Sequence, residues 1–163
     1  MNYEEWLAAV PSEFISDPLW HMEVYRPAMF ASDLAWQDVS RLMEDKRTVS
    51  LSDQLYRAVG SISANISEGY SRSSGRDQAR FYEYALGSAR EARGWYCQGR
   101  HVLSEPVAKH RIKLLTAVAR MLLKIIPSER GYKIREEVAT YRVRDDLAQD
   151  TELSTLLAEI SMP

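Results

Sequence analysis

Four long segments of the chain carry apolar residues alternately three and four positions apart, and this spacing constrains the fold more than any other feature. Such spacing places the apolar side chains on one face of an α-helix. No comparable run alternates every second residue, as a half-buried strand would. The four segments span about residues 27–43, 50–69, 74–102 and 104–127. We therefore expect an all-α fold.

Short polar connections separate these segments and carry signals for helix ends. Ser50 and Ser74 are each followed by an aspartate three residues later, a pattern that caps a helix N-terminus. Ser104 is placed to cap the last segment, and Pro127 with Gly131 predicts where that segment ends. Because short connections favour antiparallel neighbours, we expect an up-down-up-down four-helix bundle with short helical N- and C-terminal extensions.

The chain of 163 residues suits one folded core flanked by these extensions. We divide it into an N-terminal helix and linker (1–24), the bundle (25–127) and an acidic helical extension (128–163). The N-terminal part carries three candidate docking groups, Trp6, Phe14 and Trp20. The C-terminal part carries an apolar stripe that requires a partner, Leu153, Leu156, Leu157 and Ile160.

The third segment contains Gly87, Gly94 and Gly99, each of which costs about 1 kcal/mol relative to alanine inside a helix. Close approach of another helix would offset this cost, and the second segment offers Gly60 and several small residues beside it. The approach could join helices of one chain or of neighbouring subunits, and we place intrachain packing first. The expected inner face of the third segment consists of Phe81, Ala85, Ser88, Ala92, Trp95, Gly99 and Val102.

Charge is unevenly distributed along the chain although the net charge is only -2. Residues 1–50 carry a net charge of -5, residues 51–127 of +6 and residues 128–163 of -3. The basic middle can hold a polyanion or an acidic segment, or it can be ordinary solvated helix surface. Nine basic side chains are candidate contacts to nucleic acid or a protein partner: Arg72, Arg76, Arg80, Arg90, Arg93, Arg100, Lys109, Arg111 and Lys113.

Two polar residues near the end of the second segment require partners. Asn65 falls on an apolar line of its helix, and Glu68 lies in the last turn, where the helix dipole disfavours a negative charge. A compensating cation is expected nearby, among Arg72, Arg76 and Arg80. We interpret Asn65 and Glu68 as a structural polar network that fixes helix register, and the alternative is a small binding site.

Catalytic and metal-binding patterns are missing from the sequence. None of His21, His101 and His110 follows a glutamate by three residues, as the ligands of di-iron bundles do. The single cysteine, Cys97, is expected to be a small core residue. We predict no metal, no cofactor and no enzymatic activity. The acidic N-terminus is unlike a secretion signal and no apolar run reaches about 20 residues, so we expect no membrane segment and a cytoplasmic location.

Three motifs in the second and third segments point to a known family. They are Gln54-Leu55-x-Arg57-Ala58, Ser61-Ile62-x-x-Asn65-Ile66-x-Glu68-Gly69 and Ala85-x-Gly87-Ser88-x-x-Glu91. With them, residues 25–127 resemble the 23S rRNA intervening-sequence family of four-helix-bundle proteins. The resemblance implies a bundle that associates as a homopentamer, in a family whose members mostly have no established biochemical activity.

A related branch, the accessory variability proteins of diversity-generating retroelements, is similar in fold. That similarity implies binding of nucleic acid and of a reverse transcriptase through a basic pentameric barrel. From the residues and the resemblance together we predict a non-enzymatic oligomeric scaffold or adaptor. Its basic helix faces would hold RNA, DNA or a nucleic-acid enzyme such as a reverse transcriptase. The alternative is a protein-only interaction module.

Overall fold

The structure is a computed structural model that describes residues 2–130 and residue 155. Helices make up all of the regular structure within these residues, which confirms the all-α prediction. Their bounds are α1 (Tyr3–Ala9), α2 (Ser12–Ile15), the 3-10 helix η1 (Pro18–His21), α3 (Tyr25–Leu42), α4 (Val49–Tyr70), α5 (Gly75–Leu103) and α6 (Glu105–Arg130).

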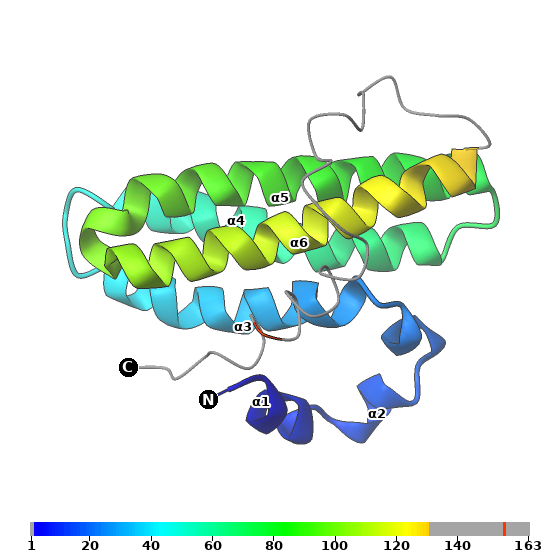
Figure 1. The fold of residues 1–163 in the computed structure, drawn as a ribbon, viewed down its shortest axis with the longest axis horizontal. Coiled ribbons are helices and arrows are strands. Elements are labelled where there is room, and N and C mark those ends of the chain that lie inside the picture. The colour runs from blue at the N-terminus through cyan, green and yellow to red at the C-terminus, as the bar shows by residue number, and fades with distance from the viewer. Residues whose placement is uncertain (1, 131–154, 156–163) are drawn as a thin grey trace.

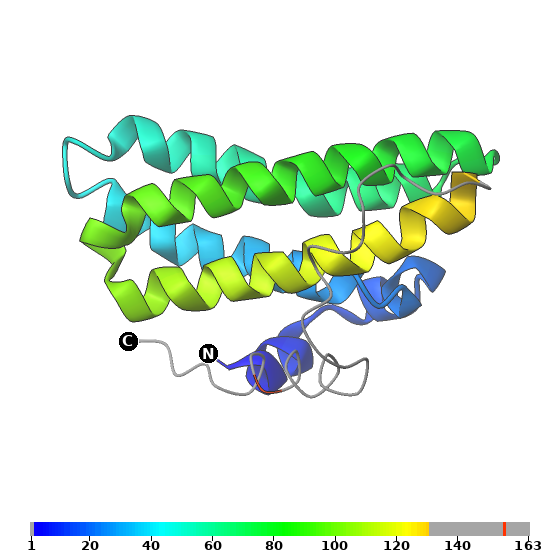
Figure 2. The same ribbon diagram turned by 45° about the horizontal axis from the view of Figure 1, so that its top comes forward.

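The four long helices α3 to α6 form the predicted antiparallel up-down-up-down bundle (Figure 1). Each helix packs against the next one in the chain, and α3 also contacts α6, so the bundle closes on itself (Figure 2). Its interior contains the largest fully buried side chains: Phe30, Leu34, Leu42, Leu55, Ile62, Ile66, Tyr96, Leu103, Leu114, Leu115, Leu122 and Ile126. Burial of these apolar side chains stabilises the arrangement.

Two of the predicted helix ends differ from the structure. Ser74 caps α5 as expected, because its hydroxyl accepts a hydrogen bond from the Asp77 backbone N–H at 3.1 Å. α4, however, begins at Val49, and Thr48 precedes it without a side-chain cap. α6 continues through Pro127 to Arg130, so the prediction that Pro127 ends this helix is wrong. A proline near the end of a helix interrupts only one backbone hydrogen bond and can be accommodated.

The inner face of α5 is rotated by about one residue from the predicted one. Ala85, Ala92 and Gly99 are buried as expected, but Phe81, Ser88 and Trp95 are only partly buried. The residues that point inward in their place are Tyr82, Leu86, Ala89, Tyr96 and Leu103. An inward tyrosine requires a buried partner for its hydroxyl, and the bundle supplies one for Tyr96.

That partner is a buried ion pair between Asp38 on α3 and Arg111 on α6. Arg111 Nε lies 2.8 Å from Asp38 Oδ2, and the two side chains are 6% and 7% exposed. The Tyr96 hydroxyl on α5 donates to the same carboxylate oxygen at 2.9 Å. One carboxylate therefore joins three helices. Arg111 was predicted to be a surface contact for nucleic acid, and its burial shows that prediction to be wrong.

The buried hydroxyl of Tyr96 gives the fold a dependence on alkaline pH. Burial, with a contribution from Asp38, raises the pKa of Tyr96 well above its usual value. The stabilisation is complete below about pH 10, where the unfolded chain begins to lose this proton, and is lost as the pH rises further. We expect the free energy of unfolding to fall by about 1.4 kcal/mol per pH unit above pH 10 through this group.

Urea titrations between pH 8 and pH 11 measure that slope. Tyr96→Phe should make it shallower, whatever its effect on stability at pH 8. Some slope should remain, because burial also raises the pKa of Tyr82 to about 12. Tyr56→Phe, at an exposed position, is the matched control and should leave the slope unchanged. An equal slope in the Tyr96→Phe protein and the unaltered one would contradict the assignment.

The N-terminal segment packs on the outer side of α3. Trp6 of α1 and Trp20 of η1 are 4% and 5% exposed, so two of the three predicted docking groups are buried. The third, Phe14, is 44% exposed. None of the helices described in residues 2–130 is both long enough and apolar enough to cross a membrane.

Candidate nucleic-acid interface

The nine basic residues proposed from sequence lie in three different places. Arg72, Arg76 and Arg80 lie at the corner between α4 and α5. Arg111 is buried. The remaining five belong to the surface that α5 and α6 share, and they are Arg90, Arg93, Arg100, Lys109 and Lys113. The structure therefore does not bring the nine residues together into one site.

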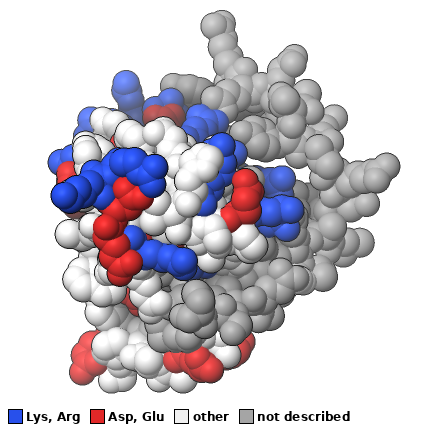
Figure 3. All heavy atoms as spheres, turned by 90° about the vertical axis from the view of Figure 1, so that its left-hand side faces the viewer, with Lys and Arg blue, Asp and Glu red and all other residues white. Residues whose placement is uncertain are grey.

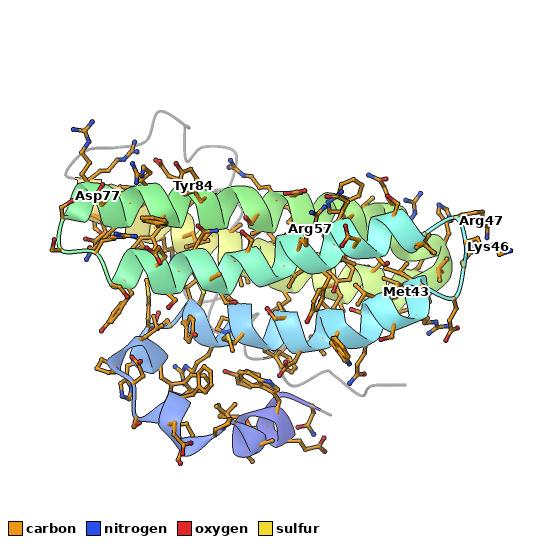
Figure 4. All side chains as sticks on the ribbon, turned by 180° about the vertical axis from the view of Figure 1, so that it is seen from behind. Met43, Lys46, Arg47, Arg57, Asp77 and Tyr84 are labelled. Carbon is orange, nitrogen blue, oxygen red and sulfur yellow. The ribbon has the colours of Figure 1, made fainter. Side chains whose placement is uncertain are left out.

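The α4–α5 corner combines its arginines with nearby acids and an aromatic ring. Arg72 forms an ion pair with Glu68, which confirms the expected compensating cation. The guanidinium carbons of Arg72 and Arg80 lie 4.7 and 5.5 Å from the centre of the Phe81 ring. Asp77 lies at the start of α5 (Figure 4). With Glu68 and Asp77 beside three arginines in the sequence, the corner has a smaller excess of positive charge than residues 90–124.

Asn65 belongs to a different network from Glu68. Its side-chain amide donates to the Ser61 carbonyl at 2.8 Å and lies 2.9 Å from the Ser61 hydroxyl. The Ser88 hydroxyl of α5 donates to Ser61 at 3.1 Å. Asn65 therefore has its hydrogen-bond partners among serines of α4 and α5, and its role in fixing helix register stays a prediction. The alternative of a binding site formed by Asn65, Glu68 and three arginines does not match this geometry.

The outer surface of α5 and α6 concentrates positive charge. Residues 90–124 contain eight lysines and arginines and two glutamates, and Arg111 alone among the eight is buried. We name the other seven the basic face: Arg90, Arg93, Arg100, Lys109, Lys113, Arg120 and Lys124. The set of nine residues predicted from sequence omitted Arg120 and Lys124. Their spacing from Lys109 and Lys113 places them on the same side of the helix and could have identified them.

Helix geometry explains how the basic face is assembled. Lys109, Lys113, Arg120 and Lys124 follow one another at spacings of four, seven and four residues, which places them on one stripe of α6. On α5, the side that faces α6 is identified by two ion pairs, Glu83 with Arg130 at 2.7 Å and Arg100 with Glu105 at 3.6 Å. Arg93 and Arg100 lie on that side, seven residues apart, with Arg90 beside Arg93.

Three cations of the basic face are accessible to a ligand. Lys109 and Lys113 are exposed, and Arg93 is half-buried with its Nε buried and without a hydrogen-bond partner. Phosphate oxygens can bind to such cations without first displacing an acid. At the bundle end that carries the α3–α4 loop, acids and bases lie side by side (Figure 3). There, hydrogen bonds from Arg47 lower the pKa of Asp45 to about 2.

Only one of the aromatic residues of α5, which could stack on bases, is well exposed. Tyr84 is 53% exposed, whereas Tyr82 and Tyr96 are buried. Trp95 is half-buried, and its ring N–H donates to Glu91 at 3.2 Å. Contacts to a nucleic acid would therefore depend on charge and hardly at all on stacking.

Three helix-interior glycines are exposed on the outer sides of α4 and α5. A Cβ added to Gly60, Gly87 or Gly94 would meet nothing within 4 Å. Intrachain packing, which we placed first, therefore does not explain these three residues. It does explain Gly99, where a Cβ would lie 3.3 Å from the Leu42 side chain. We name Gly60, Gly87 and Gly94, with the exposed Ala64 and Tyr84, the glycine face.

Cys97 is exposed, so the prediction that it is a core residue is wrong, and the rotation of α5 is the reason. Within the part of the chain that the structure describes, no group of three or more His, Cys, Asp and Glu residues is placed to hold a metal ion. The apolar stripe from Leu153 to Ile160 lies outside the described residues.

Comparison with known proteins supports the family suggested by the motifs. The model of the 23S rRNA-intervening sequence protein family matches residues 21–124, which is well over half of the chain. No curated protein and no solved structure matches. The matched residues include α3, α4 and α5 and most of α6, and therefore nearly the whole bundle and basic face. The chain belongs to the 23S rRNA-intervening sequence protein family.

Proposed function

We propose that this protein is a non-enzymatic, self-associating scaffold that holds nucleic acid on its basic face. The observation that carries the proposal is the excess of positive charge along residues 90–124 of α5 and α6, where seven cations outside the core accompany two glutamates. A row of lysines and arginines along two antiparallel helices is a surface to which a phosphate backbone can bind. The overall net charge of -2 conceals this local excess.

The chemistry of the basic face determines the kind of binding. Lysine and arginine at these spacings contact phosphates, which carry no sequence information. Tyr84 is the one well-exposed ring among the aromatic residues of α5, so stacking adds little. Binding should therefore tolerate any nucleotide sequence. Its affinity should fall steeply with salt concentration, because salt cations compete with the protein for the phosphates.

A mobility-shift titration of the purified full chain tests this proposal. Labelled single-stranded RNA, single-stranded DNA and duplex DNA of about 30 nucleotides would each be titrated at several salt concentrations. We expect binding at low salt with a linear decrease of log affinity against log salt. No binding of any of the three at low salt would remove nucleic acid from the proposal.

Self-association is the second part of the proposal, and the glycine face supports it. Each of its three glycines costs roughly 1 kcal/mol in helix stability, and among the described residues nothing lies within 4 Å of where a Cβ would be. A neighbouring subunit that approaches the backbone closely would offset this cost. The glycine face lies on α4 and α5, and most of the basic face lies on α6. The homopentamer implied by the family resemblance is the assembly we propose.

Substitution of the exposed glycines should affect stability and assembly in opposite directions. In Gly87→Gln/Gly94→Gln, both new side chains project into open space, so the isolated chain should gain roughly 0.5 kcal/mol per site in helix propensity. The same side chains would block close approach of a second subunit. Light scattering should report a smaller particle, while urea unfolding of dilute protein reports equal or higher stability. A particle of unchanged mass would contradict a role for this face in assembly.

A further inference from the structure

The N-terminal helix α1 packs on the bundle as a bound peptide would. Its contacts come from Tyr3, Trp6, Leu7 and Val10, at positions i, i+3, i+4 and i+7. Trp6 is buried, and the other three are partly buried against the core. This is the spacing by which amphipathic helices insert into grooves on partner proteins.

The groove that receives α1 lies on the outer side of α3 and is closed at one end by η1. The ring of Phe30 lies 5.1 Å from the ring of Tyr3 and 5.2 Å from that of Trp6. Trp20 lies 6.0 Å from Trp6. Asp33 accepts a hydrogen bond from the Trp6 ring N–H. An apolar slot with one acceptor selects an indole, so this groove is specific for a tryptophan-bearing helix.

The connection between α1 and the bundle has little packing of its own. Every residue from 11 to 18 is exposed, and α2 within it buries no side chain. α1 has seven residues, too few to be stable without its groove. The family match begins at residue 21, so the matched part of the chain does not include α1. Within residues 2–130, the apolar contacts that hold α1 to the rest of the chain are therefore those in the groove.

We propose that α1 also docks in trans, into the same groove on a second copy of the chain. The second copy presents identical residues, so every groove contact made within one chain can be made between two. Residues 10–18, when extended, span about 30 Å, which gives α1 the reach to leave its own subunit. Exchange of an identical element is a low-cost route to association. The inference goes beyond nucleic-acid binding and depends on neither the basic face nor the glycine face.

The test uses two complementary full-length variants and a fluorine label. The groove-deficient chain carries Phe30→Ala and Asp33→Ala, retains Trp6, and is labelled with 5-fluorotryptophan. The helix-deficient chain is unlabelled and carries Trp6→Ala with the groove intact. The fluorine resonance that is present in the labelled unaltered protein and missing from labelled Trp6→Phe protein is that of Trp6. The resonances of Trp36 and Trp95, which lie outside the groove, report that the bundle remains folded.

In the labelled groove-deficient chain alone, the Trp6 resonance should move to the position of a solvent-exposed indole. Addition of the helix-deficient chain should return it to the position seen in the unaltered protein. The matched control is an unlabelled chain with all three substitutions, which self-associates equally but offers no groove and should cause no shift.

Failure of the helix-deficient chain to move the resonance at any concentration would overturn the proposal. So would a Trp6 resonance that never leaves the docked position in the groove-deficient chain, because α1 would then be held elsewhere. If the Trp36 and Trp95 resonances show that Phe30→Ala unfolds the bundle, Phe30→Leu with Asp33→Ala replaces it, because leucine keeps the buried position apolar while the ring and the acceptor are still removed. Nucleic-acid binding plays no part in this measurement, so its outcome is separate from that of the mobility shift.

Discussion

Replacement of Arg111 by alanine should lower the free energy of unfolding by about 3–5 kcal/mol. The substitution removes the only cation paired with Asp38 among the described residues, with Nε and Nη2 lying 2.8 and 3.3 Å from the two carboxylate oxygens. Asp38 would remain buried with the Tyr96 hydroxyl as its one remaining side-chain donor among the described residues. An uncompensated charge in the core is far more destabilising than a missing surface contact. Urea unfolding of the purified variant measures the loss.

Two controls separate the charge effect from loss of packing. Removal of the whole network, in Asp38→Leu/Tyr96→Phe/Arg111→Met, should recover most of the stability, because apolar groups of similar size replace a desolvated pair at little net cost. Arg76→Ala, at an exposed position, should cost less than about 0.5 kcal/mol. A loss on Arg111→Ala no larger than that of Arg76→Ala would show that the pair does not hold the bundle.

The class and topology of the fold could be predicted from local patterns. Apolar spacings define helices, and connections of a few residues leave antiparallel neighbours as the simplest arrangement. The Ser74 and Asp77 pattern was equally readable, because a cap is made by residues three apart in sequence. Such features depend on neighbours along the chain and not on the tertiary structure.

The rotation of α5 depends on contacts that are distant in sequence. Phe81, Ser88 and Trp95 fit a heptad spacing as well as Tyr82, Ala89 and Tyr96 do, so spacing alone cannot choose between the two faces. The structure places Tyr96 inside, where Asp38, 58 residues earlier in the chain, accepts a hydrogen bond from its hydroxyl. The exposed position of Cys97 follows from the same rotation.

The burial of Arg111 could have been predicted from the positions of Asp38 and Arg111 on their helices. Asp38 lies on the apolar stripe of α3 with Leu34, Leu42 and their neighbours, and Arg111 lies on that of α6 with Leu114 and Leu115. An acid and a base on the inner stripes of two different helices predict a buried pair. Counting positive residues along a segment, without asking which face each one occupies, placed Arg111 on the surface.

Removal of three cations from the basic face should weaken nucleic-acid binding by about a hundredfold at 0.1 M salt. Arg93→Gln/Lys109→Gln/Lys113→Gln eliminates three phosphate contacts while keeping long polar side chains on both helices. Each contact to a single strand contributes about 0.7 to the slope of log affinity against log salt, so the slope should decrease by about 2. Mobility-shift titrations between about 0.05 and 0.5 M salt measure both the affinity and the slope.

The α4–α5 corner supplies a control with the same change in charge. Arg72→Gln/Arg76→Gln/Arg80→Gln also removes three positive charges, but the first is paired with Glu68 and the third lies near the Phe81 ring. If charge acts through direct contact on α5 and α6, this variant should lose little affinity and retain nearly the full salt slope. Equal losses in the two triple variants would mean that overall charge, and not the basic face, determines binding. Because both sets were predicted from sequence as one group, their separation tests the contribution of the fold itself.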